Sequence, residues 1–366
     1  MHPNGSPMMK RPVSSSHTSL NQIEKPPSKF VQFWRRIYLP LGFQKGYNFP
    51  LFFIFAGALF GFSLARLSYL NIAGNDSHSY ANGTSPGEWY WFSHGIYRVG
   101  ITLHLVTILP AGLLMVWQFL PVIRHKFLIV HRINGYLVII LSIVSNVGAV
   151  MIVRRAFGGT LATQAGVGLL AIISTASIGM AYYNIKRLQI DQHRAWMLRA
   201  VFYLATIVTL RLIMILSALI SSQASGYDTT MSCGEIFSIY DTPQNVTSLY
   251  PQCGQPGSSD DTRVIVQASF ANGQAEQIGT SLRLSFGMAL WMALFLHLVG
   301  VEIYLNLTPR ESNRLRQVSY ERQMEKGLEP FGSAGLTVDR WGDAEPWKPV
   351  EEVAMADPDK IEKHGI

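Results

Sequence analysis

Two short stretches of the sequence place histidine and arginine side by side at the start of an apolar segment. The first is HRING at residues 131–135, and the second is HRAWMLR at residues 193–199. Imidazole rings bind metal ions and haem iron or relay protons near neutral pH, and guanidinium groups bind carboxylates and phosphates. These motifs therefore predict a site for an anion, a proton or a metal centre at the edge of an apolar region.

The composition indicates that the apolar region is a lipid bilayer. Of the 366 residues, 48% are hydrophobic and only 14% are charged, whereas soluble domains have roughly 25% charged residues. A helix needs about 20 residues to cross the hydrocarbon. Six apolar segments are long enough, near residues 50–70, 98–119, 128–152, 161–185, 196–220 and 284–306. We therefore predict an all-α integral membrane protein with a bundle of six transmembrane helices.

The positions of Lys and Arg predict the orientation of this bundle, because short loops rich in these residues stay in the cytoplasm. Basic residues are frequent in the N-terminal segment, in the loops after the second and fourth spans, and in the C-terminal tail. The 71–97 loop has no Lys or Arg, and the 221–281 loop has only Arg263. Both termini are therefore predicted to be cytoplasmic, although the two arginines of the 154–160 turn do not follow the rule.

The two loops predicted to lie outside carry signs of the secretory pathway. Three asparagines begin N-glycosylation sequons: Asn75, Asn82 and Asn245. The chain has only two cysteines, Cys233 and Cys253, and both lie in the long outer loop, where an oxidising lumen would join them. We therefore predict a glycoprotein of the endoplasmic reticulum, plasma membrane or vacuole with a disulfide-closed loop. A mitochondrial membrane remains an alternative, because the N-terminal segment is basic, Ser-rich and nearly free of acids.

The predicted organisation has three parts. Residues 1–49 form a disordered basic cytoplasmic tail, residues 50–306 form the membrane domain, and residues 307–366 form a largely disordered cytoplasmic tail. The formal net charge of +7 follows mostly from the topology, so the lipid bilayer, and not nucleic acid, is the expected partner. Protein partners and the oligomeric state cannot be read from the sequence.

Polar residues inside the spans are the candidate functional residues, because lipid tolerates them poorly. His131 and His193, with Arg132, Arg194 and Arg199, lie near the inner surface in the predicted topology. His104 and Arg211 lie nearer the outer surface. We predict that the two His-Arg motifs meet in one polar cluster on the cytoplasmic side. The alternative is that the arginines only reach towards lipid headgroups and that the histidines are structural.

Haem is the cofactor that such a cluster would suit, since two imidazoles at matching depth can bind the iron axially. His131 and His193 satisfy this condition, and His104 is a further candidate, which suggests a haem b redox protein of the cytochrome b561 type. A second haem is hard to build, because His94 and His104 would be about 15 Å apart on one helix. Beyond haem iron, no metal site is predicted. A transporter, a lipid- or anion-binding membrane protein and a non-catalytic scaffold are the alternatives, and whether the protein is an enzyme stays open.

Several of these motifs occur together in a known pattern. The segments are LHLV (103–106), WQFLPVIR (117–124), HRINGYL (131–137), YYNIKRLQIDQHRAWMLRA (182–200) and TLRL (209–212). The pattern resembles an uncharacterised multipass membrane family of bacteria and fungi, domain of unknown function 2306. The matching residues are His104, Gln118, Phe119, His131, Arg132, Gly135, His193, Arg194, Trp196, Met197, Arg199 and Arg211. The resemblance covers about residues 98–220 and implies a shared helical unit of unknown activity.

Overall fold

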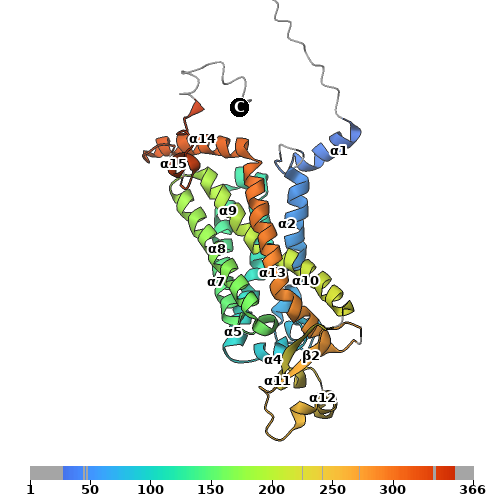
Figure 1. Ribbon diagram of the computed structural model, residues 1–366. Helices are drawn as coiled ribbons and strands as arrows, with labels where there is room; N and C mark the ends of the chain where they lie inside the picture. Colours follow the sequence, from blue (N-terminus) through green and yellow to red (C-terminus); the bar gives the residue numbers. More distant parts are fainter. Residues whose placement is uncertain are drawn as a thin grey trace, which may run out of the picture.

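Six helical segments form the membrane domain (Figure 1). The computed structural model describes residues 28–43, 46, 48–224, 226–240, 242–271, 273–332 and 335–350. Within them, the segments long and apolar enough to cross a membrane are α2 (Asn48–Ala65), α5 (Gly95–Gln118), α7 (Leu128–Ile152), α8 (Leu161–Lys186), α9 (Ile190–Leu204) continued by α10 (Thr206–Gln223), and α13 (Ala275–Asn306). The predicted all-α membrane protein with six spanning helices is confirmed.

The helices of the bundle pack in long pairs: α5 along α7, α8 along α9, and α10 along α13. Glycines allow the closest of these contacts. A Cβ atom on Gly148 of α7 would lie 2.7 Å from the backbone nitrogen of His104 in α5, and one on Gly100 would lie 2.8 Å from the side chain of Ile152. The backbones of α5 and α7 therefore approach as closely as they do only because these positions lack side chains.

The last span is longer than its hydropathy predicts. Helix α13 begins at Ala275, inside the predicted 221–281 loop, because its first turns pack against protein and not lipid. Glu276, in the first turn, is fully buried and accepts hydrogen bonds from the hydroxyls of Tyr240 (2.6 Å) and Tyr250 (3.1 Å). A search for apolar segments cannot detect a helix whose surroundings are other protein groups.

The loops at one end of the bundle form a small folded unit, residues 67–92 and 228–267, which we call the outer cap. Its elements are η1 (Leu67–Leu70), α3 (Tyr80–Gly83), α4 (Glu88–Phe92), β1 (Asp228–Ser232), α11 (Cys233–Phe237), α12 (Pro243–Leu249), η3 (Pro251–Gly254) and β2 (Arg263–Gln267). Strands β1 and β2 pair antiparallel, with Thr230 opposite Ile265. Cys233 and Cys253 form the predicted disulfide, which is therefore confirmed. It packs in a core with Met231, Ile236, Val246, Val264 and Val266.

The opposite end of the bundle carries both α1 (Lys29–Tyr38) and α14 (Pro309–Lys326), and we call it the terminal end (Figure 1). Helix α14 packs on α9, with the Ser319 hydroxyl donating to the carboxylate of Asp191 at 3.3 Å. The segment after residue 307 thus differs from the predicted disordered tail, because polar contacts hold a helix whose sequence has no apolar stripe. Residues 1–27 and 351–366 lie outside the described residues. The side of the membrane on which the terminal end lies stays a prediction.

Shorter elements complete the chain between these units. They are α6 (Pro121–Lys126), η2 (Ala156–Gly159) and α15 (Val338–Trp341). In η2, Phe157 has a left-handed backbone, with φ of 47° and ψ of 48°. A phenylalanine adopts this conformation only where its surroundings stabilise it, and those surroundings belong to the site described below.

Opening the disulfide is expected to destabilise the outer cap. In the Cys233→Ser/Cys253→Ser double variant, the cross-link between residues 20 apart is lost, at a cost of about 3 kcal/mol in the chain-entropy model. Arg263 is the only basic residue between residues 228 and 267, so trypsin reports local opening by cleavage there. We expect cleavage on the order of 100-fold faster than in the wild type, with the exposed substitution Ser248→Ala as control. Equal rates in all three proteins would contradict the expectation.

Candidate functional site

The structure brings the two histidines of the His-Arg motifs near each other at the terminal end. His131 in α7 and His193 in α9 are close enough for their charges to interact. The side-chain nitrogen of Gln118 donates to the His131 carbonyl oxygen (3.2 Å), and Nδ1 of His193 donates to the carbonyl oxygen of Ala181 (2.9 Å). The first hydrogen bond joins the end of α5 to α7, and the second joins α8 to the start of α9.

The arginines of the same motifs have separate partners. Arg132 is exposed on α7, and Arg194 donates to the Thr308 hydroxyl at 3.3 Å and lies over the Tyr304 ring. Arg199 forms a bidentate ion pair with Glu302 of α13, at 2.6 and 2.9 Å. Arg194 and Arg199 therefore contact Thr308 and Glu302, whereas the charge of Arg132 acts on His131. That the two motifs form one polar cluster stays a prediction.

A haem site of the cytochrome b561 type is not supported. The described residues contain no group of three or more His, Cys, Asp or Glu that could hold a metal ion. Nδ1 of His104 lies within 2.9 Å of the Ser145 hydroxyl and 3.1 Å of the Ser145 carbonyl oxygen in the α5–α7 interface. The hollow lined by Tyr203 and Leu298 and the one lined by Lys186 and Gln323 have no histidine in their walls. The contacts of His104 are those of a structural residue joining two helices.

Arg211 lies at the opposite end of the bundle from the two His-Arg motifs and faces aromatic rings. Its guanidinium group is 4.8 Å from the ring centre of Phe157 and 5.8 Å from that of Phe286. The two rings are stacked, with their centres 4.2 Å apart. This cation–π contact gives a desolvated arginine a favourable partner, and it also holds Phe157 in its left-handed conformation.

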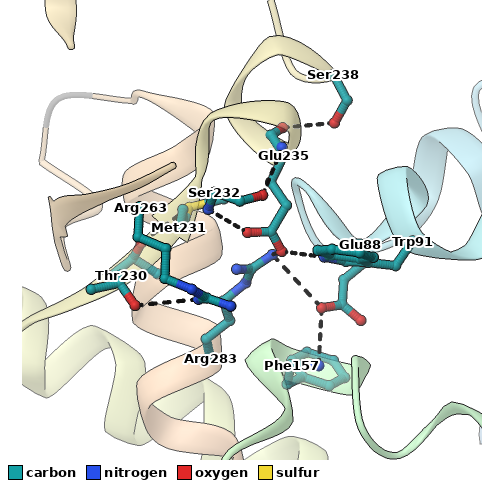
Figure 2. A network of polar contacts seen from close by, with 11 residues as sticks. Glu88, Trp91, Phe157, Thr230, Met231, Ser232, Glu235, Ser238, Arg263 and Arg283 are labelled. Atoms are coloured by element: carbon teal, nitrogen blue, oxygen red, sulfur yellow. Dashed lines mark hydrogen bonds and ion pairs between the residues drawn. The ribbon is translucent and has the colours of Figure 1, made fainter. Parts of the chain in front are cut away.

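A buried charge network joins the outer cap to the bundle (Figure 2). Arg283 of α13 is only 3% exposed, and its Nη2 lies 2.9 Å from Oε1 of Glu235 and 4.0 Å from Oε1 of Glu88. Glu88 is also buried and accepts a hydrogen bond from the backbone nitrogen of Phe157 at 2.9 Å. We call Glu88, Glu235 and Arg283 the outer charge network. It connects α4, α11, η2 and α13, which are far apart in the sequence.

Local structure orients Glu235 within this network. Ser232 and Glu235 form a capping box at the start of α11, in which each side chain binds the other residue's backbone N–H. The indole nitrogen of Trp91 donates to Oε1 of Glu235 at 2.6 Å, and the Arg155 guanidinium lies 3.5 Å from the centre of the Trp91 ring. One oxygen of Glu235 therefore caps a helix while the other meets Arg283 and Trp91.

The two carboxyl groups have different proton affinities. Burial raises the pKa of Glu88 to about 7, against the opposing effects of Arg283 and the Phe157 N–H. Burial also acts to raise the pKa of Glu235, but Arg283 and hydrogen bonds from Ser232 and Trp91 lower it below its usual value. One guanidinium thus neutralises one carboxylate, and the second carboxyl group retains its proton up to about neutral pH.

The sequence gives little indication of the outer charge network. Glu88 and Glu235 appear as ordinary loop acids, and Arg283 lies just before the predicted last span. The available signal is the Ser-x-x-Glu spacing at residues 232–235, which is typical of a helix N-terminus. It predicts α11 but not the partner of its glutamate, because that contact spans 48 residues of the chain.

The terminal end has a groove on its lipid-facing side, which we call the α13 groove. It has a volume of about 550 Å³ and is lined by Tyr203, Leu298, Val299, Glu302, Ile303, Asn306 and Leu307. Arg199 forms an ion pair with Glu302, and its guanidinium group also lies 4.7 Å from the ring centre of Trp196. The Glu302 side chain nevertheless remains 46% exposed, which is unusual for a carboxylate on a spanning helix.

The central helices match a known protein family. Residues 101–234 match the model of the predicted membrane protein family DUF2306. The resemblance expected from the sequence is therefore confirmed over this segment, which holds both His-Arg motifs, His104, Arg211 and the start of α11. Arg283 and Glu302 lie beyond it, on α13.

A fungal protein is similar to this chain over most of its length. The chain is similar to Ava biosynthesis cluster protein G of Aspergillus versicolor, with 22% identity over 73% of this chain and 90% of that protein. No solved structure matches the chain. The protein is thus an integral membrane protein whose similarity to the family lies in its central helices.

The raised pKa of Glu88 makes the docking of the outer cap dependent on pH. A carboxyl group whose pKa is higher in the folded state than in the unfolded state stabilises the fold at low pH, and this stabilisation is lost as the pH rises through the folded value. We therefore expect the melting temperature to fall as the pH rises from about 4.5 to about 7, between the unfolded and folded pKa values of Glu88, and to level off above pH 7. In Glu88→Gln, a neutral isostere keeps the bond from Phe157, so the pH dependence should flatten.

The measurement is thermal unfolding of detergent-purified protein across this pH range. Glu345→Gln, which removes an exposed acid near the C-terminus, serves as the matched control and should keep the wild-type slope. The same slope in Glu88→Gln and in the wild type would show that Glu88 does not carry the titration.

Proposed function

We propose that this protein binds a small amphiphilic molecule, taken from the bilayer, in the α13 groove. The observation that carries the proposal is the half-exposed carboxylate of Glu302 among apolar groove walls. The apolar walls suit a hydrocarbon chain, and the Arg199–Glu302 pair suits a polar head.

The depth of the groove supports this proposal. Glu302 is four residues before Asn306, the last residue of α13, so it lies about 6 Å from the end of the helix. That is the depth at which headgroups meet acyl chains. Leu298 and Val299 line the groove on the side of Glu302 that faces the bilayer centre, where a chain would continue.

The hydrogen bonding of Glu302 suggests the chemistry of the head. Arg199 donates to both carboxylate oxygens from one side, and each oxygen can accept a further bond. A carboxylate left exposed to lipid is costly, so a ligand that donates N–H or O–H groups would stabilise it. We therefore favour an amphiphile with an amine or hydroxyl head over a fatty acid or a phosphate ester.

The fungal relative is named as a biosynthesis cluster protein. This name favours a small molecule over a macromolecular partner. For the location we propose a membrane of the secretory pathway, with both termini cytoplasmic. The predicted glycosylation sites Asn75, Asn82 and Asn245 support this orientation, because all three are exposed at the cap end.

Photocrosslinking tests the proposed binding. The probe is a diazirine-bearing long-chain amino alcohol, incubated with the purified full chain in nanodiscs and located by peptide mass spectrometry. We expect labelling of α13 near Leu298 and Ile303. Glu302→Gln should reduce labelling about tenfold, as expected for the loss of one charge-assisted hydrogen bond.

A pair of matched tryptophan variants separates the groove from general lipid contact. Leu298→Trp fills the groove, whereas Met292→Trp adds the same bulk at an exposed position of α13 outside it. Labelling should be lost in the first variant and kept in the second. Equal labelling in both would rule out the groove as the binding site.

A further inference from the structure

Helix α1 has two chemically distinct faces. Four large apolar residues recur at helical spacing on one side: Phe30, Phe33, Trp34 and Ile37. Three basic residues lie on the remaining surface: Lys29, Arg35 and Arg36. The helix contains no acidic residue. A short helix of this kind, aromatic on one side and cationic on the other, is typical of segments that lie in the plane of a membrane interface.

The apolar face of α1 is exposed to an extent that would be unfavourable in water. Phe30 is 70% exposed and Phe33 is 59% exposed, and Trp34 and Ile37 are also exposed. This patch is continuous with the membrane domain, because α2 enters the bundle ten residues after α1 ends. The bilayer is thus the apolar phase that lies next to the patch.

Contacts with the bundle fix the position of α1. The rings of Trp34 and Tyr38 pack on Phe49, in the first turn of α2, with ring centres 6.1 and 6.4 Å apart. The backbone nitrogen of Val122 donates to the carbonyl oxygen of Leu41 at 3.1 Å. Next to Leu41, Gly42 has φ of +88°, and a Cβ atom on Gly42 would lie 3.0 Å from Cβ of Pro121.

These contacts hold α1 at the level where α2 enters the bundle, and Figure 1 shows it running away from the bundle at an angle to α2. Its uncovered aromatic face is thereby held at the membrane surface and is not free to turn into solution. Attachment at the Tyr38 end leaves the Phe30 end extended over the surrounding lipid.

We infer that α1 is an interfacial anchor that binds anionic phospholipids of the leaflet at the terminal end. Its aromatic face lies among the upper acyl chains, and Lys29, Arg35 and Arg36 bind headgroup phosphates and carboxylates. Charge complementarity selects this partner, because the apolar face alone fits any lipid, whereas three cations without a compensating acid favour a negative surface. Each basic residue near such a surface adds about a fivefold preference.

Spin labelling of the full chain tests the position of α1. The two native cysteines are joined in a disulfide, so a single introduced cysteine can be labelled selectively. Labels at Phe33→Cys and Gln32→Cys report the apolar and polar faces in nanodiscs of phosphatidylcholine with 30% phosphatidylserine. We expect the label at position 33 to be accessible to oxygen and protected from a water-soluble relaxation agent, and the label at position 32 to show the reverse.

Two other patterns would overturn the inference. A label at position 33 that is accessible to the water-soluble agent would place the helix in solution. A label at position 33 that is protected from both agents would show that protein, such as a second copy of this chain, covers the face.

Native mass spectrometry from mixed-lipid nanodiscs tests the lipid preference. The Arg35→Gln/Arg36→Gln variant should retain at least tenfold less phosphatidylserine than the wild type. The charge-preserving Arg35→Lys/Arg36→Lys variant and Arg322→Gln, an exposed arginine of α14, should both match the wild type. Unchanged phosphatidylserine in the Gln variant would overturn the assignment of anionic lipid, whatever the depth of the helix.

Discussion

One guanidinium shared between two buried carboxyl groups holds the outer cap on the membrane bundle. Arg283 is presented by α13, Glu88 by α4, and Glu235 by α11 in the disulfide-closed segment after α10. Removing Arg283 or Glu235 would leave the other as a buried charge without its partner, which generally costs several kcal/mol. The left-handed turn at Phe157 depends on the same network, because its N–H is bound by Glu88 and its ring lies under Arg211.

The two ends of the molecule use charge in different ways. At the cap end, Glu88, Glu235 and Arg283 are buried, and their contacts fix the loops in one arrangement. At the terminal end, the Arg199–Glu302 pair is half-exposed and lies beside an apolar groove. A buried network is typical of a structural role, whereas an open carboxylate among apolar walls leaves hydrogen-bonding capacity for a ligand.

The spans, the outer disulfide and the central family segment could be predicted because each rests on local sequence. Hydropathy over about 20 residues detects a helix in lipid, and two cysteines in one loop allow only one pair. The outer charge network could not be predicted, since its members come from three distant segments and pair only after the cap has folded. Helix α14 was missed for a related reason: contacts such as Ser319 with Asp191 stabilise it, and they leave no periodic pattern in the sequence.

Helix α13 also sets the thickness of membrane in which the protein fits. Between Arg283 and Glu302 it has no Asp, Glu, Lys or Arg, and 19 residues of α-helix rise about 28 Å. The two ion pairs therefore mark the upper and lower edges of the hydrocarbon, close to the thickness of a typical bilayer. In a thicker bilayer one of them would be drawn into lipid, and in a thinner one apolar side chains would meet water, so the helix would have to tilt or the bilayer deform.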